Sequence, residues 1–529
     1  MGTLEIPEDV LSIGEGAFAE CRSIEGVIFP RDLESIRSGA FINCFGIGRI
    51  VCKGTLPAYV MPGAFDGVAK DNFTLEVPES AIQQYQTATG WNDFKRISVY
   101  RNLVIRPMVA TAINTQVMRD LVLNADEEWE VESKPDWVTL SAMSGTGKAE
   151  LRLTFAQMAK GAATRHGEVV FKLKDKDYRT RCTVTQYDYE YAEDEIVTLQ
   201  TATKGNGVNI VFLGDGYSAK DIHEGKLMAN ITEAMGHYFN IEPYKAYRDY
   251  FNVYTGIAVS PESGIGSVNT IINNRFNTTA KGGVTLGGRN SDGSDYAEIF
   301  RYACKAPTVS DGNLSQALIV MIPNTEDYGG ICYLYDDGAA IAYCPMSDYG
   351  YPFDFRGVIQ HEAGGHGFGK LGDEYIYHNA FIDACDCTCC GHVDAIRGAK
   401  ALGWYANLSL TGKMNEVPWS HLIFHEKYNT FVDIFEGGYM HNRGVFRSEQ
   451  NSCMNNDIPY YSTVSREAIV KRIKAIAGEE YSFEDFVARD VTDAAMNAPA
   501  QTRSGSWSMA KGGRHQHAPV MMGSRPRIK

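Results

Sequence analysis

Residues 357–369 have the sequence GVIQHEAGGHGFG, in which His361 and His366 stand five residues apart and Glu362 follows the first histidine. On a regular α-helix five residues turn the chain by about 500°, so the second imidazole would lie about 140° away from the first. A π-bulge adds one residue to a helical turn and would bring both imidazoles back to one face. The two adjacent glycines between the histidines are best able to take up this distortion. We therefore expect a helix with a one-residue π-bulge.

Two histidines on one helix face, with a glutamate beside the first, form the pattern of a catalytic zinc site. His361 and His366 would be the neutral imidazole ligands, and Glu362 the general base that takes a proton from the attacking water. A catalytic zinc also needs a third protein ligand and an open position. The first acids after the helix are Asp373 and Glu374, so either carboxylate could be that ligand. The alternative is a glycine-rich helix that packs two core histidines and binds no metal.

The surrounding region, from about residue 197 to 490, alternates strand-like and helix-like patterns. A helical pattern follows the first of three buried-strand candidates, which are residues 208–213, 251–254 and 317–321. Strands that alternate with helices imply an α/β layer architecture. Residues 491–529 are rich in glycine, serine and basic residues, so we expect a loosely ordered or wrapping tail there.

The first hundred residues contain a repeat with a period of 23. Residues 13–21 (IGEGAFAEC) recur as residues 36–44 (IRSGAFINC), and a weaker copy, PGAF, follows at residues 62–65. A period in the twenties predicts a solenoid, in which each unit buries its apolar face against its neighbours. The phenylalanine of each copy would form the stacked core. Over about residues 1–98 these repeats resemble the BspA-type leucine-rich repeats of Bacteroidetes surface proteins.

Residues 99–190 contain short alternating runs, which suggest an all-β sandwich. Trp129 and Trp137 are the expected core anchors, because aromatic residues are prominent in sandwich cores. Together with Arg165-His166-Gly167 and Thr185-Gln186, these tryptophans resemble the BACON domain, which is also common in Bacteroidetes surface proteins. The resemblance implies a contact with carbohydrate or mucin.

Several sequence blocks around the histidine helix occur together and in order. They are GDGY at residues 214–217, FNVY at 251–254, SPESG at 260–264, LGDEY at 371–375, GVFR at 444–447 and SCM at 452–454. Over about residues 197–485 they resemble the IgA-peptidase family of zinc metalloendopeptidases, from which the extra glycine between the histidines departs. The resemblance implies an α/β zincin-like (metzincin-like) metallopeptidase fold for residues 197–490.

The same resemblance assigns further roles. It aligns Asp373 with the Asp-Glu pair of the family, so Asp373 is the expected third ligand and Glu374 a group that orients a histidine. Met454 resembles the methionine turn beneath the zinc in metzincin-type enzymes. Independently of the resemblance, Tyr460 or Tyr461 is a candidate oxyanion donor. The expanded His-Glu-x-x-x-His form also occurs in the dipeptidyl peptidase III family, where both histidines bind zinc.

The composition narrows the class of protein. The chain has 529 residues, enough for roughly three or four domains, and its formal net charge of −15 argues against binding to nucleic acid. No stretch approaches the roughly 18 uninterrupted apolar residues of a membrane span. The start, MGTLEIPEDV, lacks the basic and apolar regions of a signal peptide and begins within the repeat pattern. We therefore expect that a natural N-terminal segment is missing.

Four of the 12 cysteines lie within residues 384–391, ACDCTCCG. With His392 they would be a second metal site, but they lack the Cys-x-x-Cys pairs of structural zinc sites. We favour disulfides on an exposed loop, which suits an oxidising compartment. The four are Cys385, Cys387, Cys389 and Cys390.

Together these patterns predict a multidomain, secreted or cell-surface zinc endopeptidase with Glu362 as catalytic base and His361, His366 and Asp373 as metal ligands. Its substrate would be a host or environmental protein or glycoprotein, and its N-terminal modules would position it on carbohydrate or mucin. Neither a nucleic-acid partner nor a membrane span is expected. The competing class is a non-catalytic adhesin that keeps the fold without the chemistry. The five-residue spacing favours this class, whereas the retained Glu362 opposes it.

Overall fold

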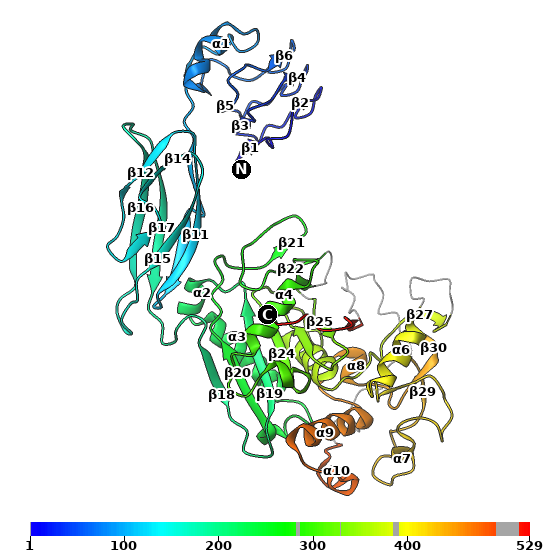
Figure 1. Ribbon diagram of the computed structural model, residues 1–529. Coiled ribbons are helices and arrows are strands. Elements are labelled where there is room, and N and C mark those ends of the chain that lie inside the picture. Colours follow the sequence, from blue (N-terminus) through cyan, green and yellow to red (C-terminus); the bar gives the residue numbers. More distant parts are fainter. Residues whose placement is uncertain (1, 282–285, 328, 384–390, 493–517, 529) are drawn as a thin grey trace. The chain divides into compact units, whose positions relative to one another are not determined.

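Figure 1 shows the computed structural model, which describes residues 2–281, 286–327, 329–383, 391–492 and 518–528. The chain divides into two compact units. The first contains residues 1–109, 118–154 and 167–183, and the second contains residues 110–117, 155–166 and 184–529. Among the described helices, none combines the length and the apolar composition that a membrane crossing needs.

The N-terminal repeats form two parallel ladders of short strands. The larger ladder has the order β1 (Thr3–Glu5), β3 (Gly26–Phe29), β5 (Arg49–Cys52), β7 (Leu75–Val77) and β8 (Ile97–Val99). The smaller contains β2 (Ser12–Ile13), β4 (Ser35–Ile36) and β6 (Tyr59–Val60), and the short helices η1 (Glu79–Ala81) and α1 (Ile82–Thr87) follow. Because each strand pairs with its equivalent in the next repeat, the repeat period becomes the register of the sheet.

The phenylalanines of the three repeat copies stack on one another. The ring centroids of Phe18 and Phe41 are 5.1 Å apart, and those of Phe41 and Phe65 are 5.5 Å apart, with nearly parallel planes in both pairs. Trp91, which is fully buried, continues the cluster at 5.7 Å from Phe65. The predicted phenylalanine core is therefore present.

Two antiparallel sheets follow the repeats. One has the order β10 (Val109–Ile113), β17 (Arg179–Tyr187), β16 (Arg165–Leu173), β12 (Glu128–Ser133) and β14 (Ser144–Thr146). The other has the order β13 (Val138–Leu140), β15 (Ala149–Phe155), β11 (Val117–Ala125) and β9 (Leu103–Arg106). Trp129 is 1% exposed and packs against Phe171, as predicted for a core anchor. Trp137 is only half-buried beside Gly167, so its prediction as a core anchor is wrong.

A mostly parallel sheet forms the centre of the second unit (Figure 1). Its order is β18 (Ile196–Gln200), β20 (Phe251–Gly256), β19 (Val208–Asp215), β24 (Leu318–Pro323), β26 (Ala340–Tyr343), β25 (Ile331–Leu334) and β31 (Val520–Met521). The three predicted strands correspond to β19, β20 and β24, and every residue of these strands is buried. β18 runs antiparallel to β20, and β25 runs antiparallel to β26 but parallel to β31.

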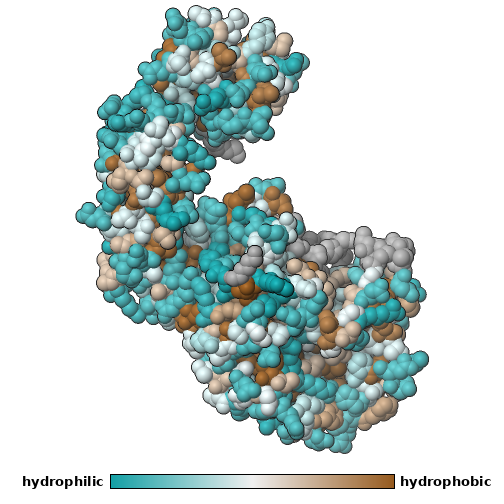
Figure 2. All heavy atoms as spheres, viewed as in Figure 1, coloured by the Kyte–Doolittle hydropathy of each residue, from teal (hydrophilic) through white to brown (hydrophobic). Residues whose placement is uncertain are grey.

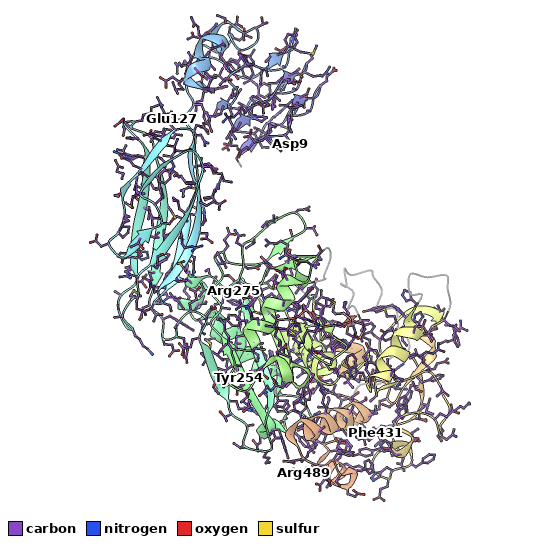
Figure 3. The ribbon with its side chains drawn as sticks, viewed as in Figure 1. Asp9, Glu127, Tyr254, Arg275, Phe431 and Arg489 are labelled. Carbon is purple, nitrogen blue, oxygen red and sulfur yellow. The ribbon has the colours of Figure 1, made fainter. Side chains whose placement is uncertain are left out.

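Helices pack on both faces of this sheet. One core includes residues from α2 (Ala219–His223), α3 (Lys226–Tyr238), α5 (Phe355–Val358), η4 (Ile359–Phe368) and α9 (Thr463–Ala477). The other includes α4 (Ser294–Ala303), with Tyr254 of β20, labelled in Figure 3, 4% exposed within it. Hydrophilic residues dominate the visible face of the chain, with hydrophobic ones scattered among them (Figure 2).

The remaining elements of the second unit are short. One small sheet contains β21 (Gly266–Ser267), β22 (Thr278–Ala280) and β23 (Leu286–Gly288), and another contains β27 (Ile376–Phe381), β28 (Leu408–Ser409), β29 (Phe435–Gly438) and β30 (Met440–Arg447). The other helices are η2 (Arg248–Tyr250), η3 (Asp311–Gln316), α6 (His392–Ala401), α7 (Ser420–Ile423), α8 (Cys453–Asn456) and α10 (Phe483–Arg489).

A buried carboxylate fixes the loops at the carboxyl end of β19. Asp215 is fully buried and accepts hydrogen bonds from the backbone N–H groups of Gly216, Phe276 and Thr278 at 3.0, 3.1 and 3.0 Å. The Ser260 hydroxyl donates to the same carboxylate at 3.3 Å. Asp215 thus connects three separate segments to the end of the central sheet.

Replacing Asp215 by alanine is therefore expected to lower the free energy of unfolding by about 3 kcal/mol, because buried N–H donors lose their acceptor. Urea unfolding measures this change. As a control, Asp249→Ala removes a carboxylate that is 61% exposed and should change stability by less than about 0.5 kcal/mol. Equal effects of the two substitutions would contradict the role of Asp215.

Candidate active site

The helix that carries both histidines, η4, is a π-helix over its whole length, Ile359–Phe368. Its backbone bonds join residues five apart, as between the Gly369 N–H and the Gly364 carbonyl at 2.9 Å. The five-residue spacing therefore returns both imidazoles to one face, with ring centroids 4.7 Å apart. A π-distortion is present as predicted, but it extends over ten residues instead of one.

The adjacent glycines of η4 allow close packing against two other elements. A Cβ on Gly364 would overlap the Tyr461 hydroxyl, and a Cβ on Gly365 would overlap the sulfur of Met454. Met454 is fully buried in α8 and lies against the turn of η4 that carries the second histidine. This is the position expected for a methionine beneath the site.

The structure brings three of the predicted residues together. Nε2 of His361 and Nε2 of His366 each lie 3.1 Å from the same oxygen, Oδ1 of Asp373. One ligand atom from each residue lies within 4.8 Å of those of the other two, and all three side chains are fully buried. We call these residues the His-His-Asp cluster.

Main-chain acceptors fix which nitrogen of each imidazole faces Asp373. Nδ1 of His366 lies 2.8 Å from the Leu371 carbonyl, and Nδ1 of His361 lies 3.0 Å from the Cys453 carbonyl. A carbonyl oxygen can only accept, so each Nδ1 carries a hydrogen. In its neutral form, each imidazole would therefore present the lone pair of Nε2 to the cluster.

Two imidazole nitrogens and a carboxylate oxygen thus converge in a buried space. When both imidazoles are neutral, all three atoms are acceptors, and they repel one another unless a cation lies among them. Within the described residues, Nε2 of His366 and Oδ2 of Asp373 also have no hydrogen-bond donor. Two neutral imidazoles and one carboxylate are a common ligand set for catalytic zinc, so these residues fit a zinc ion.

The charges in the cluster favour an ionised Asp373. Burial raises the pKa of this carboxyl, but the neighbouring His366 and His361 imidazoles outweigh burial and hold the pKa at about 2. Burial lowers the pKa of His361, whereas the carboxylates of Asp457 and Asp373 raise it well above its ordinary value. Asp373 is therefore available as an anionic ligand at neutral pH.

Glu362 lies on η4 beside the cluster and is 2% exposed. Gly330 approaches it so closely that a Cβ there would lie 2.7 Å from Cγ of Glu362. Burial raises the pKa of Glu362 to about 7, against the charges of the two histidines. A carboxyl whose pKa lies near neutrality can both take and return a proton at physiological pH.

Glu374 lies apart from the cluster and does not orient a histidine. It accepts hydrogen bonds from the Asn407 amide at 2.8 Å and from the Ser452 hydroxyl at 2.6 Å. Because Asn407 also donates to the Gly372 carbonyl at 2.7 Å, this network fixes the segment that presents Asp373. The expectation that Glu374 orients a histidine is therefore wrong.

The role expected of Glu374 is filled by Asp457, which sequence reasoning missed. Its Oδ1 lies 2.9 Å from Nδ1 of His361, on the side of the ring away from Asp373. Asp457 has a left-handed backbone, with φ of 55°, which aspartate tolerates better than most residues. The only signal in the sequence is its place in the polar segment after Met454.

The two tyrosines predicted as oxyanion donors have other partners. The Tyr461 hydroxyl donates to the Gln360 carbonyl, and the Tyr460 hydroxyl donates to the Glu449 carboxylate. Both hydroxyls are therefore committed to structural hydrogen bonds, and this prediction is wrong.

Cys385, Cys387, Cys389 and Cys390 lie outside the described residues. Their predicted companion His392 has Nδ1 3.0 Å from Nε2 of His441, whose ring also contacts His378. In the part of the chain that the structure describes, only the His-His-Asp cluster gathers three ligand atoms closely enough for a metal.

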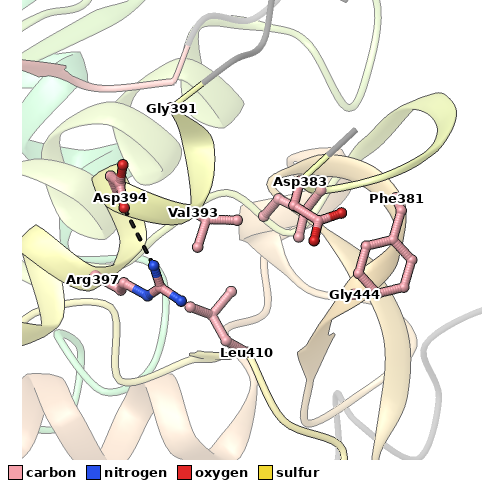
Figure 4. A pocket seen from close by; sticks show the side chains of 9 residues that line it. Phe381, Asp383, Gly391, Val393, Asp394, Arg397, Leu410 and Gly444 are labelled. Carbon is pink, nitrogen blue, oxygen red and sulfur yellow. Dashed lines mark hydrogen bonds and ion pairs between the residues drawn. The ribbon is translucent and has the colours of Figure 1, made fainter. Parts of the chain in front are cut away.

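A separate cavity of about 420 Å³ lies beside α6 and β27 (Figure 4). Its lining includes the ion pair between Asp394 and Arg397, with N and O 3.4 Å apart, and the side chains of Phe381 and Leu410. His361, His366 and Asp373 are not among the described residues that line it.

Comparison with known protein families places these features in context. Residues 196–383, which include the His-His-Asp cluster and Glu362, match the family model described as IgA Peptidase M64. Residues 1–83 match the BspA type leucine rich repeat region in six copies, and residues 127–187 match BACON, a putative binding domain. The chain therefore carries a peptidase domain. That domain matches the model of the IgA peptidase M64 family, and all three predicted resemblances are confirmed in their predicted order.

Comparisons with curated proteins and with solved structures give no further information about function. A comparison with curated proteins gave no match. Among solved structures, a Bacteroides ovatus GH5 xyloglucanase is 15% identical with a TM-score of 0.17, and the match covers 21% of this chain and 26% of that chain. The C. elegans MSP family member WR4 is 9% identical with a TM-score of 0.14, and the match covers 17% of this chain and 100% of that one. Likenesses this weak carry no argument about function.

Gly364→Ala is expected to disrupt the π-turn, because the new Cβ would displace the rigid Tyr461 ring from the Gln360 carbonyl. Zinc affinity, measured by competition with a chromogenic chelator, should fall at least about tenfold. The matched control is Gly236→Ala on α3, where nothing lies within 4 Å of the added Cβ. Unchanged zinc affinity in Gly364→Ala would contradict this account of η4.

Asp457→Asn retains an acceptor for Nδ1 of His361 and tolerates the left-handed backbone but removes the charge. Partners of this kind typically change metal affinity about 10–100-fold, and we expect a loss in that range. The exposed Asp394→Asn serves as the control. If both variants bind zinc as the unchanged chain does, Asp457 has no part in holding the ligand.

Proposed function

We propose that this chain is a zinc-dependent endopeptidase in which His361, His366 and Asp373 hold the metal and Glu362 is the catalytic base. The observation that carries the proposal is the convergence of two Nε2 atoms on one oxygen of Asp373. The match to a peptidase family over the same residues supports it.

The chemistry divides between the metal and the chain. When bound, zinc supplies a Lewis acid for activating water and polarising the scissile carbonyl. Glu362 takes the proton of the attacking water and delivers it to the leaving amine nitrogen. The carbonyls of Leu371 and Cys453 hold the two imidazoles in the tautomer that this arrangement needs.

Glu362 is suited to this part by its surroundings. Its carboxylate is held between η4 and the backbone of Gly330 and is almost removed from solvent. Within the described residues, Oε2 of Glu362 has no hydrogen-bond donor, so this oxygen can accept a proton. On sequence grounds the five-residue spacing favours a non-catalytic adhesin. In the π-helix, however, this spacing keeps both histidines in the cluster.

The proposal also covers the domain organisation, the location and the substrate of the protein. We assign residues 1–98 to a leucine-rich-repeat solenoid, residues 99–190 to a BACON-like β-sandwich and residues 197–490 to a zincin-like (metzincin-like) domain. The family matches support a secreted or cell-surface protein of a Bacteroidetes-type bacterium whose N-terminal modules contact carbohydrate or mucin. The substrate is then a host or environmental protein or glycoprotein.

Glu362→Gln should retain about one zinc per chain, because Glu362 is not a ligand, and should lose about 10²–10⁴-fold in peptide hydrolysis. His366→Ala should lose the zinc itself. Elemental analysis and a casein digest with and without chelator measure the two properties. The exposed Glu426→Gln is the control. Full hydrolysis by Glu362→Gln would remove Glu362 as the base, and a chain without zinc or cleavage would favour the adhesin.

A further inference from the structure

The outer part of the central sheet lies next to the proposed catalytic base. The backbone of Gly330 contacts Glu362, and β25 begins at the following residue, Ile331. Cys332 and Leu334 of β25 face the same core as Ala363 of η4. The outer edge of β25 is therefore a sheet edge that leads directly to Glu362.

The C-terminal segment of this chain occupies that edge. In β31, Val520 and Met521 pair in parallel with Tyr333 and Leu334 of β25. The Met522 N–H donates to the Leu334 carbonyl at 2.8 Å, and the Asp336 N–H donates to the Gly523 carbonyl at 3.0 Å. The segment is thus hydrogen-bonded as an added outer strand.

The amino-terminal end of β31 is the end that lies nearer to Glu362. Because the pairing is parallel, Ala518 is level with Ile331, two residues before the Val520–Tyr333 pair. Ala518 and Met521 pack against the core that contains η4. Residues 518–522, which we call the C-terminal strand, therefore lie along the part of β25 that leads to Glu362.

The pairing of the C-terminal strand with the sheet is short. Two residue pairs join it to β25. Beyond the strand, Arg525 forms ion pairs with Asp311 at 2.6 Å and Asp337 at 3.0 Å, whose side chains are 64% and 41% exposed. An outer strand is paired on one side only, so this strand can leave the edge more readily than an inner strand, which is paired on both sides.

Peptides that bind a sheet edge do so in extended form through main-chain hydrogen bonds. We propose that the C-terminal strand occupies the peptide-binding edge of β25 and competes there with an extended peptide substrate, so that substrate binding displaces it. The partner of this surface is an extended peptide segment recognised through its backbone. Of the two tests below, the measurement of peptide hydrolysis rests on the proposed peptidase function, whereas the measurement of peptide binding does not.

The test compares the chain with a variant ending at residue 517, both carrying Glu362→Gln so that no turnover intervenes. The probe is a fluorescein-labelled peptide of residues 518–525, APVMMGSR. Fluorescence anisotropy should show about tenfold tighter binding of the probe to the shortened variant. In the full chain the C-terminal strand covers the edge of β25 most of the time, and the apparent affinity falls in proportion to the fraction of molecules whose edge is free. Equal affinities, or no binding to either chain, would overturn the proposal.

The activity arm uses both lengths of chain with Glu362 intact. With a fluorogenic casein-derived peptide, the shortened chain should show a KM lower by about tenfold with kcat little changed, and unlabelled APVMMGSR should inhibit it competitively. An unchanged KM would overturn the proposal. If neither length hydrolyses peptides, the proposed function fails while the anisotropy result still decides this inference.

A full-length substitution guards against misfolding of the shortened chain. Arg525→Ala removes both ion pairs beyond the strand and should increase probe binding, whereas Arg527→Ala, at an exposed position, should leave it unchanged. Equal binding by these two variants would count against the proposal.

Discussion

The hydrogen bonds between residues five apart in η4 are the constraint on which the whole site depends, because they decide where the second histidine points. In an α-helix His366 would face away from His361, and Asp373 would have a single imidazole to meet. The π-turn requires neighbours that fill the space around it closely, and Tyr461, Tyr244 and Met454 do so. Gly364 and Gly365 leave room for these large side chains, since a methyl group added to either glycine would overlap one of them.

A second level of organisation comes from atoms that belong to the backbone. The Leu371 and Cys453 carbonyls determine the tautomers of the two imidazoles, and neither depends on the identity of its side chain. Glu374 contributes indirectly, because its hydrogen bonds to Asn407 and Ser452 hold the chain on either side of the cluster. The His-His-Asp cluster is therefore positioned by the folding of three separated segments, residues 359–373, 407 and 452–457.

The sequence predicts the features that depend on spacing and repetition. The repeat period gives the strand register of the first hundred residues, and the His361–His366 interval requires a π-distortion. It does not reveal contacts made by isolated polar residues far along the chain. Asp457 lies 96 positions beyond His361, and no local pattern connects them. The tyrosines fail as predicted oxyanion donors for the same reason, since the partner of a hydroxyl depends on packing that the sequence pattern does not contain.

The complete burial of the His-His-Asp cluster has a consequence for how the protein would gain and lose its ion. Side chains with no surface open to solvent can be reached by a metal ion, or by a substrate peptide, only when part of the chain moves aside. The exchange rate of a bound ion would then be limited by this opening step. Removal by a chelator would then reach a rate that no longer rises with chelator concentration. Loading during folding would be faster than loading of the finished chain, and the ion would be retained kinetically even in an environment where free zinc is scarce.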